Sequence, residues 1–185
     1  QNGNDGNSGI FSEPLKTLEA AIAKCNGKNA YIYIQDYNPI SSTIDFGSIT
    51  NYNTKIAISS TDMTVGGTPA SGTRITLKRA NQFTGKLFSN DNNFQLSFTD
   101  IIIDGNKGNV SNADPLIQAS RGMLELNNDL TLQNNNGSAL EVLTYADLVL
   151  NGGDQSINIK SNSPADGKGA VHFSSEGSFS ARNEI

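Results

Sequence analysis

The sequence has little cysteine, little charge and no long apolar run, and each of these absences excludes a class of structure or of binding partner. Its one cysteine, Cys25, excludes an intramolecular disulfide framework and a zinc site built from cysteines. No apolar stretch is long enough to cross a membrane as a helix, so we expect no membrane insertion. Charged residues make up 17% of the chain and its net charge is −5. Because a basic surface for phosphate backbones is missing, we expect no nucleic-acid partner.

Polar residues that favour turns are abundant instead. The 185 residues include 24 Asn, 20 Ser, 18 Gly and 13 Thr, whereas hydrophobic residues make up 36%. The apolar residues are spread steadily along the chain, which argues against disorder. A chain of this length can bury one core, so we expect a single folded domain over residues 1–185.

The first 26 residues predict a loop followed by the only convincing helix. Residues 1–11 are rich in Asn, Gly, Asp and Ser, and we expect them to form a loop. Over residues 12–26 apolar side chains recur at helical spacing, with Pro14 in the first turn and Gly27 just past the end. The apolar positions of this helix are Leu15, Leu18, Ala21, Ile22 and Cys25.

From residue 30 to the end the apolar residues recur with a period of two. Short runs such as 31–34 and 94–98 alternate apolar and polar residues, as strands with one buried face do. No second helical pattern separates the runs, so they form either antiparallel hairpins or a coil around one axis. Repeats favour the coil, because residues 100–106, 129–135 and 156–162 match one another and two more strand types follow each in fixed order.

Three short strands in each repeat predict a three-sided solenoid over residues 30–185, with about six circuits that stack roughly 4.8 Å apart. Side chains at equivalent positions should then form columns through the core. The predicted inward columns are Ile101, Leu130 and Ile157, then Ile117, Leu140 and Val171, then Leu124, Leu148 and Phe179.

Features outside the strands fit this arrangement. Asn106, Asn135 and Asn162 fall at the turn after a strand, where we expect their amides to stack as a ladder. The apolar stripe of the helix is expected to cover the first circuit, which would otherwise expose a backbone edge and the end of the core. Ile185 falls in the middle of a circuit, so we expect the natural protein to continue or a partner to cover this end.

Two segments near the start carry a resemblance to a known superfamily: residues 4–9 (NDGNSG) and residues 13–22 (EPLKTLEAAI). Together they resemble the entry of pectin-lyase-like right-handed parallel β-helix proteins. The repeats at 98–106 and 130–135 are similar to those of bacterial surface and adhesin-like proteins of that superfamily. The resemblance implies an all-β fold, a right-handed single-stranded parallel β-helix with an N-terminal capping α-helix. It also implies an extracellular bacterial protein with further domains in the same chain.

Enzymes of this superfamily act on acidic polysaccharides, as lyases with calcium-binding Asp clusters and a base or as hydrolases with paired carboxylates. The hydrolase signatures Asn-Thr-Asp, Asp-Asp, Gly-His-Gly and Arg-Ile-Lys are absent. The candidate acids and bases of a lyase are Asp100, Asp104, Asp114, Asp129, Arg79, Arg121 and Lys107. Only Asp100 and Asp129 share a column, so we interpret these acids as exposed turn residues. We expect no cofactor, and calcium is the alternative.

The sole histidine, His172, falls in an outward column with Gln118 and Glu141. A Glu beside a His on adjacent rungs could act as an acid–base pair in a cleft. We favour a polar pair on an exposed sheet face, because no nucleophile or third group accompanies it. Glu141 and His172 are nevertheless the best catalytic candidates in the chain.

Outward aromatic residues suggest a binding surface. Tyr31 and Tyr33 flank an inward isoleucine, so both rings should point outward. They could form a stacking platform for sugars or pack beneath the long loop at 62–72. With Gln118, these tyrosines are the candidate ligand-binding residues.

We therefore predict a non-catalytic surface module, adhesin-like or stalk-like, at the bacterial cell surface. Its long faces and loops would bind a glycan or a host surface protein. The alternative is a polysaccharide lyase or glycoside hydrolase that acts on acidic polysaccharide. The loops at 61–73 and 105–114 are the insertions expected to contribute most to binding.

Overall fold

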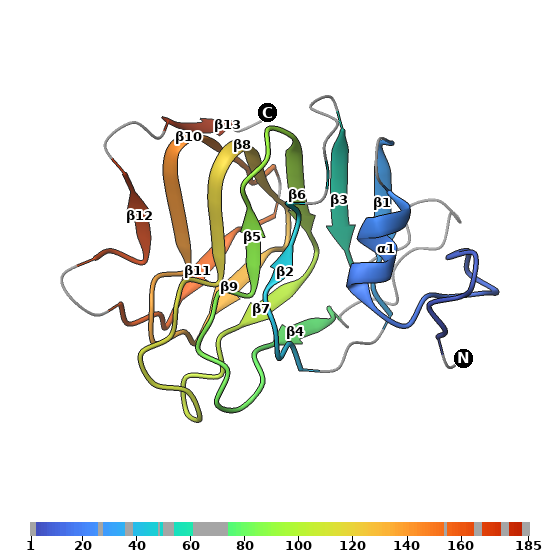
Figure 1. Ribbon diagram of the computed structural model, residues 1–185. Coiled ribbons are helices and arrows are strands. Elements are labelled where there is room, and N and C mark those ends of the chain that lie inside the picture. Colours follow the sequence, from blue (N-terminus) through green and yellow to red (C-terminus); the bar gives the residue numbers. More distant parts are fainter. Residues whose placement is uncertain are drawn as a thin grey trace.

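The computed structural model shows a chain that is almost entirely β-structure, with one short helix near its N-terminus (Figure 1). It describes residues 3–25, 28–35, 39–47, 49, 54–60, 74–153, 155–164, 168–174 and 178–182, the last range as backbone only. The strands are parallel and stack as a β-solenoid of about four turns. The predicted fold, a parallel β-helix with an N-terminal helix, is confirmed.

The helix is α1 (Leu18–Lys24). The strands in chain order are β1 (Ala30–Tyr33), β2 (Ile44–Asp45), β3 (Lys55–Ser59), β4 (Thr76–Lys78), β5 (Phe88–Asn90), β6 (Gln95–Thr99), β7 (Ile102–Asp104), β8 (Ile117–Asn127), β9 (Thr131–Gln133), β10 (Leu140–Asn151), β11 (Asn158–Lys160), β12 (Val171–Phe173) and β13 (Ser178–Arg182).

The strands form three faces, which we number in the order in which the chain visits them from β4 onward. Face 1 is the sheet β4, β7, β9 and β11. Face 2 contains β2, β5, the first halves of β8 and β10, and β12. Face 3 contains β1, β3, β6, the second halves of β8 and β10, and β13. Because β8 and β10 run from face 2 into face 3, these two faces form one bent sheet of nine strands.

The expected number of circuits, about six, is wrong. In the part of the chain that the structure describes, face 3 is built from six strands and face 1 from four. The first circuits are incomplete, because face 1 begins with an isolated bridge between Ile40 and Arg79 and β2 has only two residues. The stack therefore amounts to about four turns.

The core consists of the predicted columns of apolar side chains. Leu140 pairs in register with Ile117 and with Val171, and Leu148 pairs with Leu124 and with Phe179. The column of Ile101, Leu130 and Ile157 follows from the register of β7, β9 and β11. Column members in the middle of the stack are fully buried, whereas Ile157 and Val171 on the last circuit are half-buried. Each circuit thus buries the apolar side chains of its neighbours.

The helix is shorter than the predicted span of 12–26, since α1 starts at Leu18. Thr17 is its N-cap in extended conformation, with its side chain accepting a hydrogen bond from Ala20. The Pro14 carbonyl accepts the N–H of Asn4 (3.0 Å) instead of closing a helical turn. The Asp5 carboxylate accepts the N–H of Thr17 (2.8 Å), so the loop holds the residues before the helix in a non-helical conformation.

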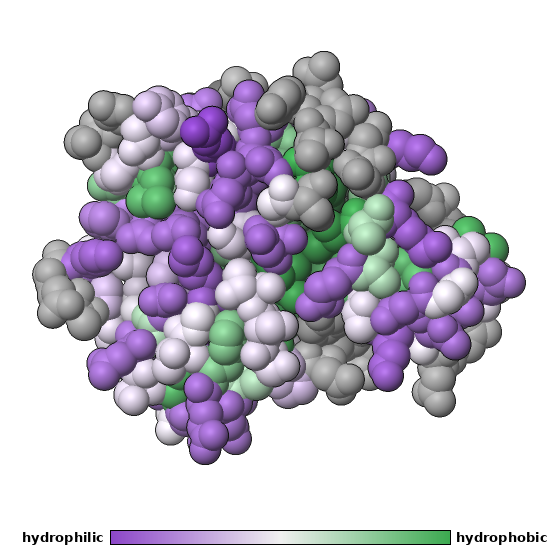
Figure 2. All heavy atoms as spheres, in the orientation of Figure 1, coloured by the Kyte–Doolittle hydropathy of each residue, from purple (hydrophilic) through white to green (hydrophobic). Residues whose placement is uncertain are grey.

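The helix nevertheless contributes to the core as expected. Leu18 and Ile22 are each 3% exposed and belong to the same apolar cluster as the strands, and Leu15 in the preceding loop is half-buried. Figure 1 shows α1 at the end of the stack where the chain begins, and the helix contacts β2. The surface in Figure 2 is largely hydrophilic, with apolar side chains visible in a hollow beside α1.

The predicted asparagine ladder is wrong. The turn after β7 is left-handed at Asn106 (φ 57°), but the turn after β9 is left-handed at Asn134 (φ 54°). Gly105 consequently lies against Asn135, where an added Cβ would be 2.6 Å from the Asn135 Cα. The side-chain amides of Asn106, Asn135 and Asn162 donate to backbone carbonyl groups, and that of Asn106 also to Asn81 Oδ1, but not to one another. These residues join turns of successive circuits to the strands.

We predict that Gly122→Ala destabilises the protein strongly. Gly122 lies at the bend where β8 passes from face 2 to face 3, with φ 72°, and an added Cβ would be 2.4 Å from the Phe94 carbonyl oxygen. Left-handed strain together with a backbone clash should cost about 2–4 kcal/mol in urea unfolding. Gly108→Ala is the matched control, because a Cβ there meets nothing within 4 Å. Equal effects of the two substitutions would contradict the bend.

Candidate functional site

The structure places the candidate residues in three separate regions. Tyr31 and Tyr33 point outward from β1 at the start of face 3. Gln118, Glu141 and His172 form the predicted outward column on face 2, because Glu141 pairs in register with both of the others. Asp100 and Asp129 lie at the corner where face 3 turns into face 1. The tyrosines and Gln118, proposed together from the sequence, therefore belong to different faces.

Glu141 is the centre of the face 2 cluster. Its carboxylate accepts hydrogen bonds from Gln118 Nε2 (2.5 Å) and Lys168 Nζ (3.2 Å). Its Oε1 also lies 3.4 Å from His172 Nδ1, an ion pair when the imidazole is protonated. The side chain of Glu141 is 13% exposed. The cluster thus links three side chains to one carboxylate.

Burial raises the pKa of Glu141, but hydrogen bonds from Gln118, Lys168 and His172 together lower it more, so the pKa lies below its ordinary value. Glu141 is therefore ionised at neutral pH. A general acid for glycoside cleavage needs a raised pKa that keeps its proton. The partners of Glu141 thus favour a polar cluster over an acid catalyst.

Asp100 and Asp129 occupy equivalent turn positions on successive circuits. Ile102 pairs with Thr131, so Asp100 and Asp129 each stand two residues before a paired position. Both adopt left-handed backbone conformations, with φ 50° and 58°, which Asp tolerates better than most residues. Arg74 extends across the corner and donates to the Asp129 carbonyl oxygen (2.6 Å) and to Thr131 Oγ1 (3.3 Å).

The Asp100 carboxyl group is affected by its surroundings. Burial, followed by the negative charge of Asp129, raises the pKa of Asp100. A hydrogen bond from Ser60 and the positive charge of Arg74 act in the opposite direction without cancelling the rise. The corner therefore holds a carboxyl group that ionises less readily in the folded protein than in the unfolded chain.

Arg79 is wrong as a candidate base. It is fully buried, and its guanidinium donates to the carbonyl oxygens of Gly85 and Asp114 and lies 5.6 Å from the centre of the Phe83 ring. Burial lowers its pKa to about 10, against the opposing charge of Asp114. The residue therefore ties together turns of two circuits and is shielded from any substrate.

The tyrosine pair has the geometry of an aromatic platform. The rings of Tyr31 and Tyr33 are nearly parallel, with an angle of 11° between their planes and 6.5 Å between their centres. Tyr31 is 66% exposed, while Ile32 between them is buried, as predicted. Their neighbours on β3 in register are the small residues Ala57 and Ser59. The rings therefore project beyond the adjacent strand.

Face 3 also carries a hydrogen-bonded network that the sequence did not reveal. The Glu125 carboxylate accepts from Lys55 Nζ (3.0 Å), Gln95 Nε2 (2.8 Å) and Asn151 Nδ2 (2.6 Å). Asn151 also donates to Asn127 Oδ1 (3.1 Å). The network joins four circuits on the same face as the tyrosines. The alternation of apolar and polar residues predicts that Glu125 points outward. Its hydrogen-bond partners could not be predicted, because they depend on the register in which the strands of the irregular first circuits pair.

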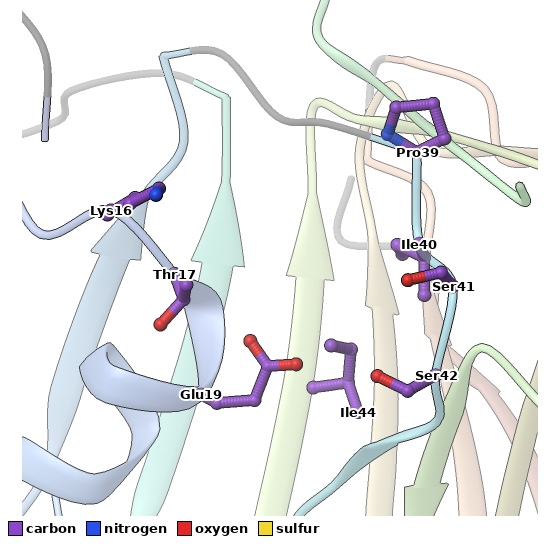
Figure 3. Close-up of a pocket in the computed structure, with 8 residues that line it drawn as sticks. All are labelled: Lys16, Thr17, Glu19, Pro39, Ile40, Ser41, Ser42 and Ile44. Atoms are coloured by element: carbon purple, nitrogen blue, oxygen red, sulfur yellow. The ribbon is translucent and has the colours of Figure 1, made fainter.

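A shallow pocket opens elsewhere, between the start of α1 and the segment 39–44. It has a volume of about 200 Å³, and Pro39, Ile40 and Ile44 contribute its apolar side chains. Figure 3 shows the Glu19 side chain pointing across it toward Ile44 and Ser42. Typical ligand pockets enclose roughly 300–1,000 Å³. The pocket is small for a binding site, and none of the sequence-predicted site residues lines it.

Of the two predicted insertion loops, 61–73 and 105–114, the structure describes the second. The span 61–73 lies outside the described residues. The loop 105–114 is anchored: Val110 is buried, and the Asn136 amide donates to the carbonyl oxygens of Lys107 (3.0 Å) and Val110 (2.6 Å). This loop therefore packs on the neighbouring circuit.

Within the described ranges, no three His, Cys, Asp or Glu side chains gather closely enough to hold a metal ion. No helix in this part of the chain has the length and apolar character needed to span a membrane. Comparison with protein-family models, with curated proteins and with solved structures gives no match.

We predict that Asp100→Asn stabilises the protein more at pH 7 than at pH 3. The pKa of Asp100 is higher in the folded protein than in the unfolded chain. The folded protein therefore loses stability as the pH rises from the unfolded pKa through the folded pKa. Asparagine cannot ionise and tolerates a left-handed backbone. Urea unfolding of both proteins across this pH range measures the difference. A gain of stability that is the same at both pH values would contradict the raised pKa.

Proposed function

We propose that this chain is a non-catalytic glycan-binding module and that its binding surface is face 3, at the tyrosine pair. The observation that carries the proposal is the nearly parallel, outward arrangement of Tyr31 and Tyr33, with Tyr31 66% exposed. An exposed ring next to hydrogen-bonding side chains suits a sugar, which presents both apolar C–H faces and hydroxyl groups. On face 3 both kinds of group come from adjacent strands.

The rigidity of the solenoid supports this proposal. Parallel pairing in register fixes the spacing of outward side chains, so the platform is held in place before a ligand arrives. Aromatic rings have few rotatable bonds and lose little conformational freedom on binding. A repeated sugar chain could then contact several circuits at once.

An enzyme is the less well supported alternative. The best catalytic pair, Glu141 and His172, includes a carboxylate that its partners keep ionised. Asp100 and Asp129 stack at a corner, and they are turn residues with left-handed backbones. Arg79, a candidate base, is buried. Each of these groups has a structural role that explains its position.

We further propose an extracellular location, at a bacterial cell surface, with an adhesin-like role toward a host glycan or a host surface protein. The resemblance to pectin-lyase-like and adhesin-like β-helix proteins supports this placement, as does the stiffness of a stacked solenoid. Membership of that superfamily is part of the same proposal.

We predict that Tyr31→Ala weakens glycan binding at least about fivefold, because a ring contact contributes roughly 1 kcal/mol or more. Binding is measured by titration calorimetry with hexasaccharides identified on a glycan array. Tyr145→Ala is the matched control, since Tyr145 is 68% exposed but lies at the bend between faces 2 and 3, against Arg121. The proposal fails if no glycan on the array binds, or if Tyr145→Ala weakens binding as much as Tyr31→Ala.

A further inference from the structure

An ion pair on face 3 neutralises the charge of the lysine nearest the tyrosines. Lys55 Nζ and Glu125 Oε2 are 3.0 Å apart, and the side chains are 38% and 14% exposed. Lys55 stands on β3 and Glu125 on β8, two strands away with β6 between them. The lysine and glutamate side chains together therefore bridge about 10 Å, two strand spacings.

Lys55 lies close enough to the tyrosines to act on a ligand there. Tyr31 pairs in register with Ala57, and Lys55 is two residues before Ala57 on the same face. Such diagonal neighbours stand about 7–8 Å apart, within reach of a long side chain. A free ammonium at this position would attract an anionic sugar bound on the platform. In the structure the Lys55 ammonium contacts Glu125 instead, so its charge is not available to such a ligand.

Glu125 is well suited to hold that lysine. Burial raises the pKa of Glu125, but the hydrogen bond and charge of Lys55, with Gln95 and Ser97, together lower it below its ordinary value. The carboxylate also accepts from Gln95 and Asn151. Glu125 is therefore ionised and fixed in place at neutral pH, and it competes with any ligand carboxylate for Lys55.

Two other described charges at outward positions of face 3 lie farther from the tyrosines and have opposite signs. Asp147 pairs in register with Met123 on β8, and Arg121 lies against Tyr145 at the bend between faces 2 and 3. Beside the tyrosines the face therefore offers one cation, Lys55, and Glu125 compensates its charge. A carboxylate-bearing sugar would find no free counter-ion there.

We infer that face 3 selects uncharged sugars and that the Lys55–Glu125 ion pair is its specificity determinant. This inference rests on the proposed glycan-binding function. Glu125 acts by occupying Lys55 and by adding a negative charge of its own, so that a uronic acid gains no counter-ion on the face. The ligand class is a neutral hexose or N-acetylhexosamine chain.

The test compares neutral hexasaccharides (cello-, manno- and chitohexaose) with hexagalacturonate, by calorimetry at low and high NaCl concentration. The wild-type protein should bind at least one neutral probe with an affinity that salt changes little, and should bind hexagalacturonate at least about tenfold more weakly. Tighter, salt-sensitive binding of hexagalacturonate would overturn the selectivity but leave glycan binding intact. Binding of neither class would overturn both.

Variants test the role of the ion pair directly. Glu125→Gln keeps the shape of the side chain but frees Lys55, and it should bind hexagalacturonate about tenfold more tightly than the wild type, with an affinity that falls as salt rises. The double substitution Lys55→Met with Glu125→Gln removes the freed cation and should abolish that gain. A Glu125→Gln protein that folds and shows no gain would overturn the assignment. If the variant does not fold, the wild-type salt series still decides the selectivity.

Discussion

The structure depends on parallel pairing of each circuit with the circuits before and after it, in register. This pairing satisfies the backbone hydrogen bonds and at the same time aligns apolar side chains into columns through the core. A shift of one residue would move those side chains to the outside. Irregularities are therefore accommodated in the turns between strands, as at Asn106, or at the bend within β8, as at Gly122.

The same register organises the outer surface. Lys55, Glu125 and Asn151 are far apart in the sequence, but the stacking of β3, β6, β8 and β10 brings them into one network. It also sets Tyr31 and Tyr33 at one end of that face. A surface network can thus arise from residues that share no local motif, which explains why the sequence indicates the tyrosines and the face 2 residues but not the network around Glu125.

Much of the fold could be predicted, because strand alternation and repetition directly encode columns such as Leu124 and Leu148. The start of α1 could not be predicted, because hydrogen bonds from the preceding loop hold Thr17 and the residues before it in a non-helical conformation. The burial of Arg79 depends on turns from different circuits that converge on its guanidinium. The alternation in the sequence predicts that Tyr31 and Tyr33 point outward. Which residues of the Glu125 network lie near them depends on how the strands of the first circuits pair, and the sequence pattern does not show this pairing.

Disulfide trapping tests the stacking most directly. Thr76 pairs with Ile102 on face 1, and adjacent strands hold such Cα atoms within the range that a disulfide bridges, about 4.4–6.8 Å. Cys25 is buried, so introduced cysteines can be oxidised selectively. Thr76→Cys with Ile102→Cys should form an intramolecular disulfide in the folded protein, detected by mass spectrometry, whereas Thr76→Cys with Asp104→Cys should not. The opposite result, or equal bridging in both, would contradict the parallel stack.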